Sequence, residues 1–234
     1  MLISKQDYII QMFHVYKRFG NRDVINDVSL NIDRNSFIYL TGPSGAGKST
    51  LLKLIYAGES LSRGQIIIDG MNLVRISRKN LFRLRRKIGI IFQDFRLIST
   101  RNVYYNVALV LEAKGLPRRY VDHKVRTVLS NVGMAHLLKA YPPSLSGGEQ
   151  QRVAVARAIA GDPAIIVADE PTGSLDPDSA LSILSLLNDY HAKGGTVVLA
   201  THDRTIFEGT NRPIVHLKDG QKTSRVEHPS PIGH

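Results

Sequence analysis

The sequence predicts a parallel α/β fold with a helical segment inserted into it. Residues 35–40 form an apolar strand that runs into a glycine-rich turn and then into a helix over 49–57. Two further runs, 164–169 and 196–200, show the continuous hydrophobicity of strands buried on both faces of a parallel sheet. Residues 94–160 have mostly helical periodicity. Strands that alternate with helices imply a parallel core, and the long helical run implies an inserted subdomain.

The N-terminal part is expected to contain several short strands. Residues 24–25 and 28–32 alternate between apolar and polar side chains, as half-buried strands do. In the helix predicted over 49–57, the apolar residues recur with helical spacing. Residues 65–70 predict a further strand that ends in a turn.

Predicted helices and strands also alternate in the rest of the chain. Residues 80–87 predict a very basic helix, and 88–93 predict a strand. The helical run that follows is broken at 115–117 and at 141–143, where proline and glycine interrupt it. The remaining expected segments are a helix at 179–190 and a frayed tail at 226–234.

Composition excludes several classes of protein. The chain has 234 residues, 43% of them hydrophobic, which is enough for a globular core. It has no cysteine, so disulfide scaffolds, thiolate metal sites and cysteine nucleophiles are ruled out. No apolar stretch approaches the roughly 20 residues that span a bilayer, and residues 1–11 lack the apolar core of a secretory signal. The net charge of +11 leaves nucleic acid or an anionic membrane surface as partners.

A phosphate-binding loop is predicted between the strand at 35–40 and the helix at 49–57. Its residues fit the pattern G-x-x-x-x-G-K-[ST]: Gly42, Pro43, Ser44, Gly45, Ala46, Gly47, Lys48 and Ser49. Glycines let successive backbone N–H groups point at one anion, and the helix N-terminus adds partial positive charge. Lys48 would supply a full charge to the β- and γ-phosphates, and the Ser49 hydroxyl would bind Mg²⁺. The strand–loop–helix context disfavours a glycine-rich turn without a ligand.

Two carboxylates, Asp169 and Glu170, end the apolar strand at 164–169. In open α/β folds, ligands bind at the edge where parallel strands end. Asp169 is suited to hold Mg²⁺, because hard cations prefer oxygen ligands. Glu170 could polarise a water for in-line attack on the γ-phosphate. Alone, such a pair is more often a solvated turn, but the phosphate loop favours the functional interpretation.

A second glycine-containing run opens an amphipathic helix, Leu145-Ser146-Gly147-Gly148-Glu149-Gln150. This run resembles the signature motif of the ATP-binding-cassette (ABC) ATPases. Other positions match that family in order along residues 8–222: Gln93 the Q-loop, 174–176 the D-loop and His202 the switch histidine. Residues 17–20 look like the loop whose aromatic ring stacks on adenine. Phe19 is the first candidate for that ring and Tyr16 the second.

The resemblance implies an ABC-type P-loop NTPase fold. It would comprise a RecA-like parallel core, an N-terminal antiparallel β subdomain and an inserted helical subdomain. A single domain would cover residues 1–225, with the core at about 1–93 and 160–225 and the helical subdomain at about 94–159. Residues 226–234 would form a flexible tail.

The resemblance also implies ATP and Mg²⁺ as cofactors and a set of site residues. Glu170, His202 and Gln93 would be catalytic, and Ser49, Gln93 and Asp169 would hold the metal. ATP would be bound by Phe19, Tyr16, Gly42, Pro43, Ser44, Gly45, Ala46, Gly47, Lys48, Ser49 and Thr50. A second copy of the chain would complete the site with Ser146, Gly147, Gly148 and Asp176.

Within that family, the chain resembles the FtsE group of bacterial cell-division ATPases. Residues 42–54, 91–97, 103–108 and 168–173 carry this likeness, and Asp94 after the Q-loop glutamine is particularly like that group. Ser174 departs from it, because close relatives usually have asparagine there. The alternative is the ATPase of a lipoprotein-releasing or macrolide-type exporter.

This subgroup implies an ATP-dependent homodimer at the cytoplasmic face of the bacterial inner membrane. Its partner would be the integral membrane protein FtsX, or a permease for an exporter, with other division proteins possible. The partner's cytoplasmic helix would enter a groove near residues 93–105, contacted by Phe95, Leu97, Ile98, Tyr104 and Tyr105; an equal alternative is that these side chains are core. DNA-repair ATPases are disfavoured, because only 98 positions separate Lys48 from Ser146, too few for a coiled-coil insertion. A nucleotide-binding pseudo-ATPase is disfavoured because the catalytic residues are all present.

A cluster of basic residues can be interpreted in two ways. It consists of Arg75, Arg78, Lys79, Arg83, Arg85, Arg86 and Lys87. A solvated helix face is the simpler interpretation, and attraction to anionic lipid headgroups is the more specific one. Nucleic-acid binding is not expected, because nothing resembles a recognition helix or an RNA-binding aromatic motif.

Overall fold

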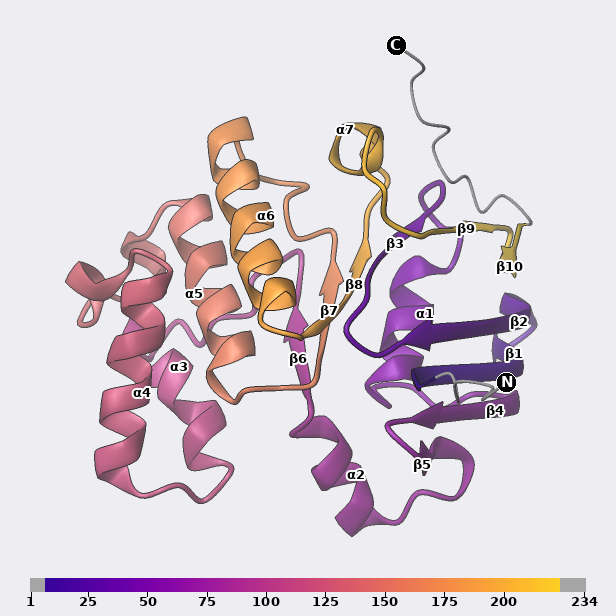
Figure 1. The fold of residues 1–234 in the computed structure, drawn as a ribbon, viewed down its shortest axis with the longest axis horizontal. Helices are drawn as coiled ribbons and strands as arrows, with labels where there is room; N and C mark the ends of the chain where they lie inside the picture. The colour runs from indigo at the N-terminus through magenta and orange to yellow at the C-terminus, as the bar shows by residue number, and fades with distance from the viewer. Residues whose placement is uncertain (1–6, 224–234) are drawn as a thin grey trace, which may run out of the picture. The chain divides into compact units, whose positions relative to one another are not determined.

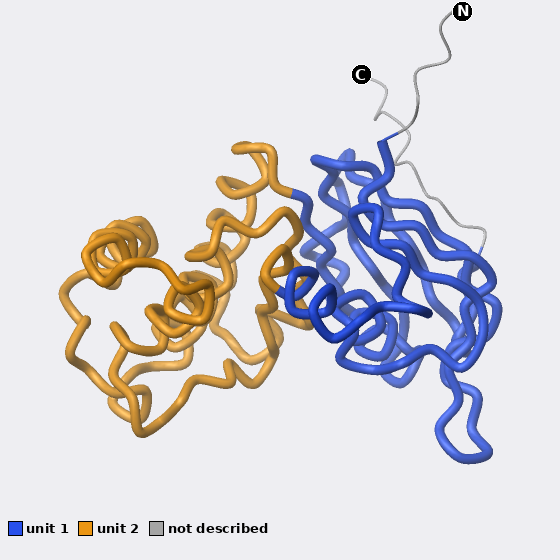
Figure 2. The backbone as a smooth tube through the Cα atoms, turned by 90° about the horizontal axis from the view of Figure 1, so that it is seen from below, with its two compact units in different colours: residues 1–85, 196–234 blue, residues 86–195 orange. Residues whose placement is uncertain are grey.

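The computed structural model describes residues 7–223. The chain divides into two compact units (Figure 2). The first unit takes residues 7–85 and 196–223 of the described part, and the second takes residues 86–195. Figure 1 labels the helices and strands of both. No helix among residues 7–223 is long and apolar enough to cross a membrane.

The first unit contains an antiparallel sheet with strand order β2-β1-β4-β5. Its strands are β1 (Tyr8–Phe19), β2 (Arg22–Asp33), β4 (Arg63–Ile68) and β5 (Met71–Asn72). This sheet is the expected N-terminal β subdomain. The short strands expected at 24–25 and 28–32 belong to one strand, β2, which pairs with β1 on both sides of an irregularity between Ile25 and Val28.

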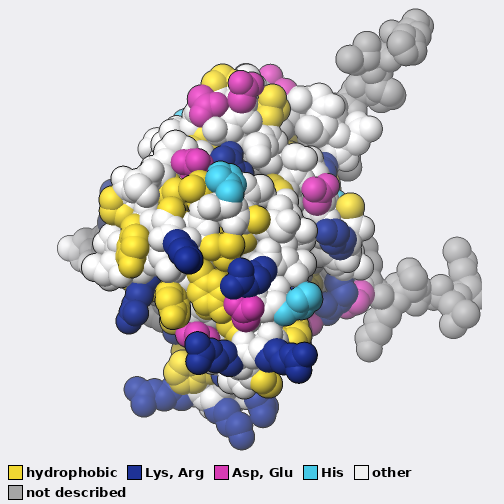
Figure 3. Space-filling model, turned by 90° about the vertical axis from the view of Figure 1, so that its left-hand side faces the viewer, with side chains coloured by type: hydrophobic (Ala, Val, Ile, Leu, Met, Phe, Trp, Pro, Cys, Tyr) yellow, Lys and Arg dark blue, Asp and Glu magenta, His cyan; other side chains and the backbone are white. Residues whose placement is uncertain are grey.

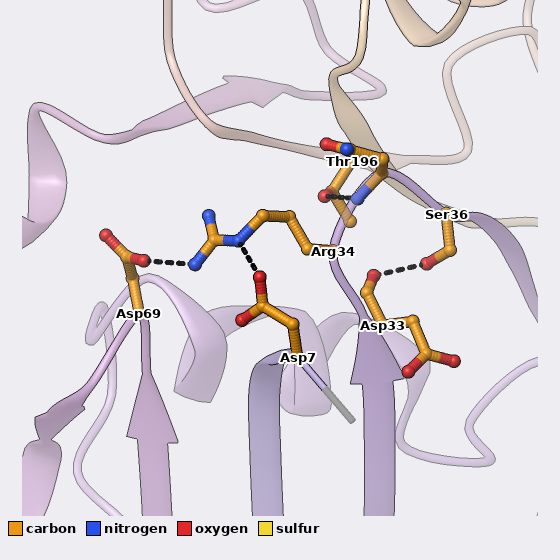
Figure 4. Close-up of polar contacts among 7 residues, drawn as sticks. Asp7, Asp33, Arg34, Ser36, Asp69 and Thr196 are labelled. Carbon is orange, nitrogen blue, oxygen red and sulfur yellow. Dashed lines mark hydrogen bonds and ion pairs between the residues drawn. The ribbon is translucent and has the colours of Figure 1, made fainter. Parts of the chain in front are cut away.

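Arg34 lies between this sheet and the next strand, β3 (Phe37–Thr41), and forms ion pairs with residues at the ends of two strands of the sheet (Figure 4). Its guanidinium donates to Asp7 at 2.9 Å and to Asp69 at 2.7 Å, so it joins the residues beside β1 and β4. These carboxylates raise the pKa of Arg34. The next residue, Asn35, donates its backbone N–H to the Thr196 hydroxyl at 3.0 Å. The chain therefore enters its next strand from a fixed position.

Parallel strands form the other part of the first unit. β3 (Phe37–Thr41) is completely buried and pairs in parallel with β8 (Thr196–Ala200) and β9 (Ile214–Lys218). The other elements of this unit are α1 (Lys48–Ile55), a 3₁₀ turn η1 (Leu73–Arg75), α2 (Arg78–Arg85), α7 (Arg204–Phe207) and β10 (Gln221–Lys222). Because β3 and β8 are parallel, the segments after them begin at the same edge.

The second unit combines two parallel strands with a helical core. β6 (Ile88–Ile91) pairs in parallel with β7 (Ile165–Asp169). The helical elements are α3 (Val103–Glu112), α4 (Arg118–Asn131), η2 (Ala135–Leu137), η3 (Pro142–Ser144), α5 (Gly147–Ala160) and α6 (Pro177–Ala192). Buried aliphatic side chains of α3, α4 and α5 form one cluster.

The predicted fold class is confirmed: parallel strands, an antiparallel β sheet and a helical segment are all present. The helix expected at 80–87 is α2, which starts and ends two residues earlier, and the strand expected to reach residue 93 ends at Ile91. Strands β9 and β10 and the short helix α7 were not predicted. The tail expected at 226–234 lies outside the described residues, and the boundaries at 94–159 stay a prediction.

Candidate nucleotide-binding site

The phosphate loop of the first unit follows β3. Its glycines permit backbone angles that disfavour a side chain, and they leave room for close backbone contacts. Gly42 and Gly47 have φ angles of +142° and +101°, which favour glycine. A Cβ at Gly42 would lie 2.1 Å from the Leu217 carbonyl oxygen, and a Cβ at Gly47 would lie 2.8 Å from the Val24 carbonyl oxygen. Gly45 has a φ of +79° and no heavy atom within 4 Å of its Cβ position. Its backbone is therefore open to a close ligand.

The N-terminus of α1 is suited to an anion. Gly47 at the N-cap supplies no side-chain hydrogen bond, and the first turn has no acidic residue. The helix dipole therefore faces the loop without a competing negative charge. Lys48 is buried, and its ammonium donates to the carbonyl oxygens of Gly42 at 2.8 Å and Pro43 at 3.2 Å. These contacts hold its charge within the loop.

His202 lies beside the phosphate loop, because it follows β8 at the edge where Gly42 follows β3. The two segments line one cavity of about 690 Å³, together with the Phe207–Gly209 turn and His216. The His202 side chain is exposed. A phosphate held by the loop would thus have a histidine on one side.

Phe19 and Tyr16, the two candidates for stacking on adenine, differ in accessibility. Phe19 ends β1 with 44% of its surface exposed, and the Lys17 ammonium lies 4.4 Å from its ring centroid. Tyr16 is half-buried, with the Arg63 guanidinium 5.6 Å from its ring centroid. Accessibility favours Phe19.

In the second unit, Gln93, Asp169 and Glu170 gather at one edge, since β6 and β7 are parallel. A Cβ placed on Gly173 would lie 3.7 Å from the Glu170 Cβ and 3.8 Å from the Gln93 amide nitrogen. Glu170 is buried and has a φ of +46°, a strained value for a residue with a side chain. Such strain is common at functional sites.

A fully buried glutamine of α5, Gln151, supports both segments of that edge. Its amide nitrogen donates to the Pro171 carbonyl oxygen at 2.6 Å and lies 3.5 Å from the Phe92 carbonyl oxygen. Sequence reasoning did not single out Gln151. Nothing about its position directly after the signature run indicates that its side chain reaches the segments at Phe92 and Pro171.

The signature run begins α5. The Ser146 hydroxyl accepts the Glu149 N–H at 3.3 Å, and the Glu149 carboxylate accepts the Ser146 N–H at 2.8 Å. These bonds form a capping box and lower the pKa of Glu149. Ser146 and Gly147 are exposed, so the N-terminus of α5 is open to a second anion.

Gly148 links the signature run to the D-loop. It is buried against α6, where its Cβ position lies 2.4 Å from the Ser179 hydroxyl oxygen and 3.0 Å from the Ser179 Cβ. Ser179 donates its N–H at 2.9 Å to Asp176, the exposed N-cap of α6. Hydrogen bonds from Ser179 lower the pKa of the Asp176 carboxyl.

Replacing Gly148 with alanine is therefore expected to destabilise the protein, because the new methyl group overlaps Ser179. Overpacking of this kind costs about 1–3 kcal/mol of unfolding free energy. Gly147→Ala is the matched control, since its Cβ would meet nothing closer than 3.7 Å. Thermal unfolding should show a lower Tm for the first variant only. Equal Tm values would mean that Gly148 is not closely packed.

The donor set fits a nucleotide with Mg²⁺. Among residues 7–223, no group of three or more His, Cys, Asp or Glu side chains is arranged to hold a metal by itself. Mg²⁺ characteristically takes one or two protein ligands and completes its shell with water and substrate phosphates. The serine hydroxyl in the phosphate loop and the carboxylate at the end of β7 are each an oxygen donor of the kind that Mg²⁺ prefers.

Comparisons with known proteins agree with this geometry. The family model described as "ABC transporter" matches residues 25–173. Cell division ATP-binding protein FtsE of Escherichia coli (strain K12) is 40% identical over 94% of this chain and 100% of its own length. Methionine import ATP-binding protein MetN of Rhizobium johnstonii is 41% identical over 88% of this chain and 57% of its own. The dimeric ATP-binding cassette MJ0796 bound to ADP and Pi superposes with a TM-score of 0.84, at 34% identity, over 91% of this chain and 96% of that one.

The chain belongs to the ABC transporter family and is an ATPase of the ABC type, with ATP and Mg²⁺ as its cofactors. Within that family it is similar to the cell division ATP-binding protein FtsE over nearly its whole length.

Proposed function

We propose that this chain is the ATP-hydrolysing subunit of an FtsEX-type membrane complex. In this complex, closing and opening of an ATP-bound homodimer would act through the membrane protein FtsX to activate peptidoglycan hydrolysis during cell division. The main support for this proposal is the 40% identity that extends over the full length of an FtsE protein. The alternative from the sequence is the ATPase of a lipoprotein-releasing or macrolide-type exporter. The similarity to MetN, a methionine import ATP-binding protein, over 57% of that protein's length makes an importer ATPase a further candidate.

ATP binding is assigned to the first unit. Backbone N–H groups of the loop from Gly42 to Thr50 would surround the phosphates, and Lys48 would contact the β- and γ-phosphates. The hydroxyl of Ser49 would be a ligand of Mg²⁺. Phe19 would stack on the adenine ring; such stacking contributes about 1–3 kcal/mol.

Hydrolysis is assigned to residues at the strand ends of both units. Glu170 would accept a proton from the attacking water, and His202 would contact the γ-phosphate and orient that water. Gln93 and Asp169 would be further Mg²⁺ ligands. Held by these residues, Mg²⁺ would supply positive charge that offsets the charge developing on the phosphate. The side chains of Gln93 and Glu170 both lie next to Gly173, which supports a role for both in hydrolysis.

The site would be completed by a second copy of the chain. Ser146 and Gly147 of that copy are exposed at the N-terminus of α5, and Gly148 lets this turn pack on α6. They would bind the γ-phosphate from its other side, and Asp176 would link the two sites. ATP would therefore stabilise the closed dimer, and hydrolysis would release it.

The membrane partner would contact the second unit near α3. Ile98 and Tyr105 are 41% and 47% exposed, whereas Phe95, Leu97 and Tyr104 are half-buried. The helical side of this unit shows apolar side chains gathered between Lys and Arg residues (Figure 3). This surface supports peripheral attachment at the cytoplasmic face of the inner membrane.

A pull-down from native membranes with ATP present tests the proposal. The tagged full-length chain should recover an integral membrane protein of the FtsX type, and the Ile98→Asp and Tyr105→Asp double variant should recover much less of it. Leu181→Asp is the control, because Leu181 is 65% exposed on α6. Recovery of a permease with a transported substrate would instead establish the alternative.

A further inference from the structure

The segment from η1 through α2 carries positive charge that the ATPase cycle does not use. Arg75, Arg78, Lys79, Arg83 and Arg85 are all exposed there. The chain has no Asp or Glu between positions 69 and 94. The segment therefore contains nothing that would neutralise its own charge.

Two apolar side chains are exposed within this basic segment. Phe82 is 61% exposed and Val74 is 52% exposed. Positions three and four residues apart are neighbours on a helix, so Phe82 lies beside Arg78, Lys79 and Arg85. The helix is already held by Leu84, which is fully buried. The Phe82 ring is thus presented outward, in the middle of a cationic face.

A groove of about 570 Å³ lies next to this face. Its walls are the loop at 57–64 and the apolar side chains of Leu73, Val74, Ile76 and Leu81. Arg85 donates to the Ala57 carbonyl oxygen at 2.9 Å and so holds α2 beside the loop. Apolar walls and arginines therefore belong to one continuous surface.

The acidic residues of the neighbouring elements are paired. Glu59, on the loop that lines the groove, accepts from the Lys17 ammonium at 3.1 Å. Asp69, before β5, is bound by Arg34 at 2.7 Å. Arg63 is exposed at the edge of the groove and adds another positive charge. The charge of this surface is therefore net positive.

We propose that η1, α2 and the adjacent groove form a docking surface for an anionic phospholipid bilayer. Basic side chains around exposed aromatic and aliphatic groups are what an interfacial segment presents to headgroups and acyl chains. Nucleic acid would engage the arginines, but it gains nothing from Val74 or from a groove with aliphatic walls. The surface shares no residue with the ATP-binding set or with the proposed contact with the membrane partner, so it adds a direct lipid contact to the proposed function.

Vesicle flotation tests the cationic part of the proposal with the full-length chain alone. Wild-type protein should bind vesicles of phosphatidylglycerol and phosphatidylcholine but not vesicles of phosphatidylcholine only. Because each basic residue at an anionic surface contributes a factor of about five to partitioning, Arg78→Glu with Lys79→Glu should weaken binding by at least about 25-fold. Arg118→Glu with Arg119→Glu is the matched control, since it makes the same charge change among exposed residues at the start of α4.

Phe82→Ala tests the apolar part. Losing this ring from the interface should weaken vesicle binding about tenfold, whereas Tyr120→Ala, which removes a ring that is 45% exposed on α4, should not. ATPase activity and Tm should be unchanged in all four variants. Equal losses in the control variants, or equal binding to uncharged vesicles, would overturn the proposal. So would binding of duplex DNA through Arg78 and Lys79 in the absence of vesicle binding.

Discussion

Lys48→Ala is expected to abolish measurable ATP binding. Lys48 is the only residue of the phosphate loop with a full positive charge, and hydrogen bonds to charged groups contribute about 1.5–3 kcal/mol each. Losing such bonds to two phosphates should weaken ATP binding at least about 100-fold. Calorimetric titration with ATP and Mg²⁺ measures this loss directly.

The control for this variant is Lys53→Ala. Lys53 lies in the last turn of the same helix, α1, so its removal changes the net charge equally without touching the loop. Its ATP affinity should equal that of the wild type. Circular dichroism and Tm measure whether both variants remain folded, so that a loss of ATP affinity can be assigned to the missing ammonium of Lys48. Retained ATP affinity in Lys48→Ala would exclude the proposed role of its ammonium.

Local patterns were sufficient to predict the segments on which the site depends. The apolar run before Gly42 is β3, completely buried, and the apolar run before Glu170 is β7. Continuous hydrophobicity identifies such strands because both faces of the sheet are covered. The break at Pro117 also agrees with the structure, since α4 starts at the next residue.

Contacts between distant segments could not be predicted in this way. Nothing in the sequence near Gly148 indicates that Ser179 lies against it, or that Gln151 reaches Pro171. Glu170 likewise has a left-handed backbone, a conformation that glycine and asparagine adopt more readily, so its residue type gives no sign of it. The sequence identified which residues are candidates, and the fold determines which of them meet.

Glu170→Gln is expected to bind ATP and to hydrolyse it very slowly. Glutamine has the shape of glutamate but cannot accept a proton from water, and a general base contributes about 100- to 10,000-fold to a rate. The substitution should therefore lower kcat at least about 100-fold with little change in ATP affinity. Since Glu170 is buried, an isosteric replacement also preserves the packing beside Gln93. Steady-state phosphate release and calorimetry measure the two quantities separately.

The same variant should accumulate as a closed dimer when ATP and Mg²⁺ are added, because the γ-phosphate that joins the two copies is no longer removed. Light scattering coupled to size-exclusion chromatography would show twice the monomer mass with ATP and the monomer mass with ADP. Glu112→Gln, at the end of α3, removes one carboxylate from an exposed position and should behave as wild type. A Glu170→Gln protein that stays monomeric with ATP and hydrolyses it at the wild-type rate would remove Glu170 from the base role. A dimer that forms without slowed hydrolysis would show instead that another group activates the water.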